Sequence, residues 1–153
     1  MTYGTRKCIP FLMHIRNNTT GTYTWTKSYG TGSNIFSLWW MALPKTLSVR
    51  DVIHVRAGLK EGSDGQGMKL YITSPHNTFA SATLYATITL ASPGDFSNKD
   101  DFPVTEGKLA VDSTLATAAA NGAAFRSWVG PADTSSSGVG YMHGLVAWVE
   151  KVG

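Results

Sequence analysis

The histidines and glycines of the chain do not form the short motifs that support catalysis. Four histidines lie far apart, and none belongs to an HxH or HExxH pair: His14, His54, His76 and His143. There is no GxSxG nucleophile elbow and no GxxxxGK(S/T) phosphate loop. Because spacing alone places no nucleophile, base and orienting group together, we predict that the protein is not a hydrolase or transferase.

Carboxylates cluster in one segment, residues 95–101. The oxygen-bearing side chains there are Asp95, Asn98, Asp100 and Asp101. They are of the kind that Ca²⁺ prefers, but the ligand order and central glycine of an EF-hand are missing. We therefore expect a solvated loop, and no metal or cofactor in the protein. Elsewhere, Asp51 borders the apolar centre of the chain, where Arg50 and Arg56 predict a simple ion pair.

Aromatic residues offer a binding chemistry that the sequence pattern supports. Residues 22–27 alternate perfectly, so Tyr23 and Trp25 share one strand face opposite three threonines. With Trp39 or Trp40 they could form a platform on which sugar rings stack. A carbohydrate-binding, lectin-like module is therefore the alternative function.

Nucleic-acid binding has weaker support from the sequence. The cations of the first half could contact phosphates, and aromatic side chains could stack on bases. These residues are dispersed, however, and the chain has neither a basic arm nor an RNP-like motif. We expect at most a non-specific contact with nucleic acid.

The stretch 35–57, IFSLWWMALPKTLSVRDVIHVRA, is the apolar centre that must position these side chains. It predicts two buried strands joined by a corner at Pro44, and its apolar density requires a second layer of structure. In the second strand, alternation assigns three residues to the core face: Ile53, Val55 and Ala57.

Alternation predicts further strands along the chain. Residues 68–73 and 82–90 alternate, and 141–152 forms a closing strand inside a sheet with Gly144 at a bulge. In the strand over 82–90, four residues are expected to face inward: Leu84, Ala86, Ile88 and Leu90. The glycine-rich segment 58–67, with its Asp-Gly pair, predicts a hairpin loop.

A helix is favoured at one place only, near 113–121. Ser113 could cap it, and Asn121-Gly122 could end it. The whole pattern predicts an all-β fold, an antiparallel β-sandwich or jelly roll of about seven to eight strands. Four segments are expected to supply its core: 35–43, 52–57, 84–90 and 145–149.

Size and composition limit the class of protein. A chain of 153 residues is expected to form a single domain over 1–153. One cysteine, Cys8, excludes an internal disulfide. We expect neither a signal peptide nor a membrane helix, and synthesis in a cytoplasm. Charged residues are only 15% of the chain, which is typical of a protein that covers much of its surface with neighbours, although a glycan-binding or cell-surface domain could look the same.

The charge of the chain is distributed unevenly. Residues 1–69 contain nine Lys and Arg and three acids, whereas residues 70–153 contain four and seven. Opposite net charges suit head-to-tail packing between copies of one chain, although the two halves could also mix on one surface. The candidate contacts are Arg50, Lys60 and Lys69 on one side and Asp95, Asp100, Asp101 and Glu106 on the other. We therefore expect a self-assembling structural subunit, a coat or decoration protein of a virus or phage particle.

Overall fold

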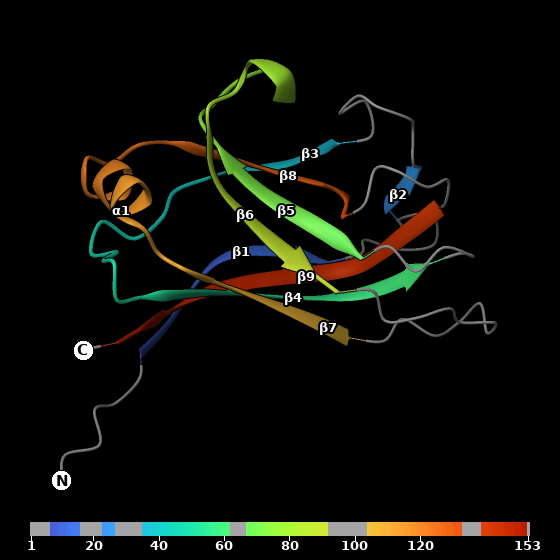
Figure 1. Ribbon diagram of the computed structural model, residues 1–153, viewed down its shortest axis with the longest axis horizontal. Coiled ribbons are helices and arrows are strands. Elements are labelled where there is room, and N and C mark those ends of the chain that lie inside the picture. Colours follow the sequence, from blue (N-terminus) through green and yellow to red (C-terminus); the bar gives the residue numbers. More distant parts are fainter. Residues whose placement is uncertain are drawn as a thin grey trace, which may run out of the picture.

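The computed structural model is a sandwich of two antiparallel sheets, and the all-β prediction is confirmed (Figure 1). It describes residues 7–15, 23–26, 35–61, 67–91, 104–132 and 139–152. Sheet A contains β1 (Lys7–Ile15), β9 (Val139–Lys151), β4 (Val52–Glu61) and β7 (Val104–Ala110) in that order, with β2 (Tyr23–Thr26) also paired to β9. Sheet B contains β3 (Phe36–Met41), β8 (Phe125–Pro131), β5 (Met68–Thr73) and β6 (Leu84–Leu90).

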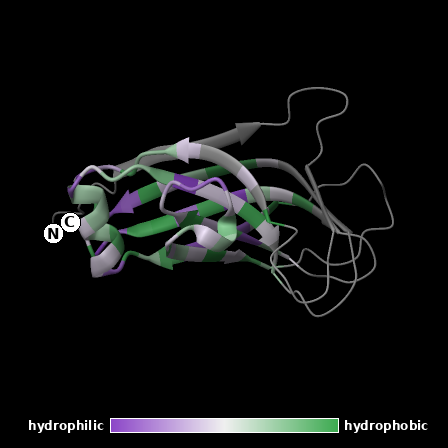
Figure 2. Cartoon of the chain, turned by 90° about the horizontal axis from the view of Figure 1, so that it is seen from above, coloured by the Kyte–Doolittle hydropathy of each residue, from purple (hydrophilic) through white to green (hydrophobic). Residues whose placement is uncertain are grey.

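The core lies between the sheets and is built from alternating apolar residues, as Figure 2 shows along the strands. The predicted core face of β4 is confirmed, since Ile53 and Val55 are fully buried. From the opposing sheet, β5 and β6 contribute five more fully or almost fully buried residues: Met68, Leu70, Ile72, Ile88 and Leu90. The closing strand β9 pairs with strands on both sides, as expected.

The prediction that Leu84 faces inward is wrong. Opposite β5, Ile72 pairs with Ala86 but Thr73 pairs with Leu84, so one extra residue bulges out of β6. The bulge reverses the alternation, which leaves Leu84 51% exposed and packs Tyr85 against the core instead.

A second bulge, in β3, makes part of the prediction for the apolar centre wrong. The register of β3 against β8 shifts between Ser37 and Trp40, and Trp40 is 58% exposed on the outside of sheet B. Val49 is exposed as well, in the connection to β4. Met41 and Leu43 are buried as predicted. The side chains of Phe36, Leu38 and Trp39 lie outside the described residues.

The connections on both sides of β4 cross between the two sheets. The corner at Pro44 joins β3 in sheet B to β4 in sheet A. The hairpin predicted over 58–67 is wrong, because β4 continues through Glu61 and does not pair with β5, which belongs to the other sheet. The two strands therefore contribute to opposite walls of the core.

The predicted helix is present as α1 (Ser113–Ala120), but Asp112 caps it instead of Ser113. The Oδ1 atom of Asp112 accepts a hydrogen bond from the backbone N–H of Leu115 at 2.8 Å. Leu115 and Ala119 are buried, so the helix lies over one end of the sandwich (Figure 1). The other helix of the described chain is the 3₁₀ turn η1 (Phe79–Ser81), and neither helix could cross a membrane.

Two glycines are required by the backbone. A Cβ atom on Gly107 of β7 would lie 2.5 Å from the carbonyl oxygen of Thr89, so β6 and β7 can approach closely only at a glycine. Gly144 has a φ of 152° and lies where the register of β9 against β4 shifts, which confirms the predicted bulge.

Candidate functional site

The outer face of sheet A contains a network of polar and aromatic side chains around His54. This face carries Val52, His54, Arg56, Glu106, Trp148 and Glu150. The Nε2 of His54 lies 2.6 Å from Glu150 Oε2, and its Nδ1 lies 3.3 Å from Glu106 Oε1. The imidazole ring stacks on Trp148 with 5.1 Å between ring centroids and 5° between planes. Arg56 donates to Glu106 Oε2 at 3.0 Å and lies over the same indole ring.

This network satisfies its charged groups internally. The hydrogen bonds from Arg56 and from His54 hold the pKa of Glu106 below its usual range. A neutral imidazole can donate through one nitrogen only, so both carboxylates receive a donor from His54 only when the ring is protonated. Among the described residues, no group of three His, Cys, Asp or Glu side chains could hold a metal ion.

On the outer face of sheet B, the cation of Arg126 lies between two indole rings. This face carries Ser37, Trp40, Lys69, Tyr71, Thr73, Arg126 and Trp128. The guanidinium carbon of Arg126 lies 5.0 Å from the ring centroid of Trp40 and 4.6 Å from that of Trp128. Its Nε donates to Ser37 Oγ at 2.7 Å, and its Nη1 donates to the backbone carbonyl of His76. Arg126 thereby fixes the exposed Trp40 ring in place.

An aromatic cluster continues this face toward β5. The Nε1 of Trp128 donates to Thr73 Oγ1 at 2.8 Å, and Trp128 is almost fully buried. Phe79 of η1 packs edge-on against Trp128 at 5.8 Å and against Tyr71 at 4.8 Å between centroids. Burial raises the pKa of the Tyr71 phenol. The segment carrying η1 is therefore packed onto the outside of sheet B.

Asp51 does not pair with Arg50 or Arg56, which corrects the expected ion pair. Its buried carboxylate accepts hydrogen bonds from Lys151 Nζ and from the backbone N–H of Ser48 at 2.8 Å. Burial raises the pKa of Asp51, but these hydrogen bonds outweigh it and the pKa is lowered. Asp51 therefore joins the start of β4 to the end of β9.

Of the candidate contact residues, the structure describes the side chains of Arg50, Lys69 and Glu106, which lie on different parts of the molecule. Arg50 is exposed in a turn, and Lys69 is half-buried on β5. Glu106 lies on the outer face of sheet A and pairs with Arg56 of its own chain. Lys60 belongs to β4, but its side chain lies outside the described residues. So do three acids, with their backbone: Asp95, Asp100 and Asp101.

Strands from both halves of the sequence share each sheet. β4 pairs with β7 and β9 in sheet A, and β3 pairs with β8 in sheet B. The halves of opposite charge in the sequence are therefore not opposite halves of the molecule.

The candidate sugar platform is divided between the sheets. Tyr23 and Trp25 belong to β2 of sheet A, whereas Trp39 and Trp40 belong to β3 of sheet B. Of these four, only Trp40 has a described side chain. The sequence analysis did not identify Arg126 as its partner, although alternation along AFRSWV places Arg126 and Trp128 on one strand face.

Comparisons with known proteins find only distant similarity. No model of a known family matches the sequence, and no curated protein is similar to it. A structure of infectious bursal disease virus, Gx strain, aligns with 95% of the chain at 9% identity and a TM-score of 0.48. A crystal structure of the T13 particle of the same virus aligns with 91% at 9% identity and a TM-score of 0.47.

The chain spans 32% of the Gx-strain protein and 30% of the T13 protein. The CBM2 module of the evolved Dit of Lactobacillus casei BL23 phage J-1 aligns with 97% of the chain and 99% of its own length, at 10% identity and a TM-score of 0.35. With identities this low and TM-scores below 0.5, these likenesses carry no argument about function.

Proposed function

We propose that the chain is a structural subunit that assembles with copies of itself, as a coat or decoration protein located in a virus or phage particle. The observation that carries the proposal is Trp40, which is 58% exposed and stacked on Arg126. Trp and Arg are among the residue types that dominate binding energy at protein interfaces. A ring that is already fixed loses little conformational entropy when a partner covers it.

The surroundings of Trp40 suit a contact with a folded partner. Trp128 and Phe79 form a packed aromatic layer beside it, which would remain rigid when water is excluded. A chain with 15% charged and 11% aromatic residues has much surface that favours contact with neighbours.

Charged residues at the edge of the contact would set its orientation. The proposed residues are Arg50, Lys60 and Lys69, facing Asp95, Asp100 and Asp101 of another copy. Exposed charges steer association and fix orientation more than they add affinity. Because such charges are screened over about 8 Å at physiological ionic strength, assembly should weaken but persist as salt rises.

Size-exclusion chromatography with light scattering tests the proposal. We expect a mass of several chains at low salt, and smaller assemblies at high salt. Changing both Asp100 and Asp101 to Lys should impair assembly while the far-ultraviolet circular dichroism spectrum stays unchanged. A chain that remains monomeric at high concentration in low salt would contradict the proposal.

A further inference from the structure

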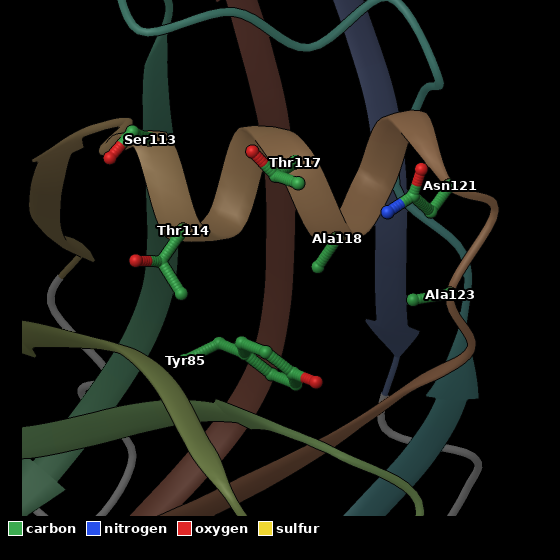
Figure 3. Close-up of a pocket in the computed structure, with 7 residues that line it drawn as sticks. All are labelled: Tyr85, Ser113, Thr114, Thr117, Ala118, Asn121 and Ala123. Atoms are coloured by element: carbon green, nitrogen blue, oxygen red, sulfur yellow. The ribbon is translucent and has the colours of Figure 1, made fainter.

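A pocket of 560 Å³ lies between α1 and β6, at the end of the sandwich (Figure 3). Its volume is within the range of about 300–1,000 Å³ that is usual for small-molecule sites. It is shallow and widely open to solvent. The lining residues are Tyr85, Ser113, Thr114, Thr117, Ala118, Asn121 and Ala123.

Both walls of the pocket follow from features already described. The bulge in β6 turns Tyr85, which simple alternation would direct outward, toward the core side and places it opposite the helix. On α1, Leu115 and Ala119 are buried, while Thr114 and Ala118, four positions apart, share a different face. Figure 3 shows both of these side chains directed toward the ring of Tyr85.

The Tyr85 ring is held by the core beneath it. It packs edge-to-face against Phe125, with 5.3 Å between centroids and 79° between planes. Phe125 is fully buried in the close-packed core, which limits the movement of both rings. The pocket therefore has a rigid aromatic wall before any ligand arrives, which lowers the entropy cost of binding.

The lining is mostly apolar in area, carries several polar groups and has no charged side chain. It offers three aliphatic hydroxyls, a phenol, a carboxamide and two alanine methyl groups. A charged ligand would lose hydration there without meeting an opposite charge in the lining. A ligand that suits the lining has hydroxyl groups around its edge and one apolar face.

We propose that this pocket binds a neutral pyranose sugar. The C–H face of the sugar packs on Tyr85, and its hydroxyls bond to Thr114, Thr117 and Asn121. Because the pocket is open, the sugar keeps part of its hydration, and we expect a dissociation constant of about 1 mM. The site is separate from the outer face of sheet B and does not depend on assembly.

Saturation-transfer NMR on the whole chain tests the proposal with methyl glucoside, methyl galactoside and N-acetylglucosamine. Glucuronic acid is the charged counterpart of glucose. We expect transfer to the ring protons of at least one neutral sugar, and weaker transfer to glucuronic acid. Lys45 packs beside Gly122 at the end of α1 without lining the pocket, so the acidic sugar also tests whether this cation attracts a ligand.

Variants locate the binding. Thr117→Val keeps the shape of an exposed helix residue, and Asn121→Ala removes an exposed amide, so each should weaken binding about three- to tenfold while the melting temperature stays nearly unchanged. Asn77→Ala removes an exposed amide on the outside of sheet B and should leave binding unchanged. Absence of binding to all neutral sugars, tighter binding of glucuronic acid, or equal effects of Asn121→Ala and Asn77→Ala would each overturn the proposal.

Discussion

On the outer face of sheet A the charged groups bond one another, whereas Arg126 on the outer face of sheet B bonds neutral groups. His54 lies between two carboxylates, and Arg56 shares one of them. Arg126 meets a hydroxyl, a backbone carbonyl and two indole rings. One of those rings, Trp40, is largely exposed.

This difference separates two uses of a sheet surface. A network such as that of sheet A stabilises the fold, and covering it would require desolvating carboxylates that are already paired. A fixed aromatic ring beside a cation, as on sheet B, has binding capacity that the chain itself does not use fully. We therefore expect substitutions on sheet A to change stability and substitutions on sheet B to change assembly.

Substitutions on the inner faces of the two sheets provide the reference for this comparison, because they should change both stability and assembly. Ile53 of sheet A and Ile88 of sheet B face the shared core with almost no exposure. Truncating either to Ala should lower the free energy of unfolding by about 2–5 kcal/mol, measured by urea denaturation. If both variants are as stable as the wild type, the strand faces are assigned wrongly.

The next largest effect is expected at His54. His54→Leu would remove the imidazole that contacts both Glu106 and Glu150 and should cost about 2–4 kcal/mol of unfolding free energy. The matched control is His76→Leu, because the His76 side chain is exposed in the segment over sheet B, and its cost should stay below about 1 kcal/mol. Equal costs in urea denaturation would remove the distinction between the two faces.

The pH dependence of stability should also differ between substitutions on the two outer faces. The pKa of Glu106 is lowered in the folded state, so its contribution is present above the ordinary carboxyl pKa of about 4 and is lost as the pH falls through the lowered value. Glu106→Gln should therefore flatten the loss of stability below about pH 4 in thermal unfolding, whereas Trp40→Ala should retain the wild-type slope. If Glu106→Gln retains the wild-type slope and Trp40→Ala flattens it, the groups that cause the acid sensitivity lie elsewhere in the molecule.

The sequence allowed the fold to be predicted wherever alternation was local. Ile53 and Val55 were assigned correctly to the core because each strand face repeats every second residue. Leu84 was misplaced because a bulge depends on the partner strand and leaves no mark in the alternation itself. The position of Trp40 was missed for the same reason.

The charged sites could not be predicted, because their members are distant in sequence. His54 meets carboxylates 52 and 96 positions away, and Asp51 meets Lys151 across 100 positions. Such pairs depend on which strands become neighbours, and several orders of strands fit the same pattern of alternation. The nearby Arg50 was therefore chosen wrongly as a partner.

The central claim is that Trp40 on sheet B carries the contact between copies. Sedimentation equilibrium of Trp40→Ala should show association weakened at least about 30-fold, the effect of losing an interface hot spot. The control is Val104→Ala on the edge strand of sheet A, because Val104 is 67% exposed and truncation there should leave association within about twofold of the wild type. Wild-type association in Trp40→Ala, or an equal loss in both variants, would contradict the account.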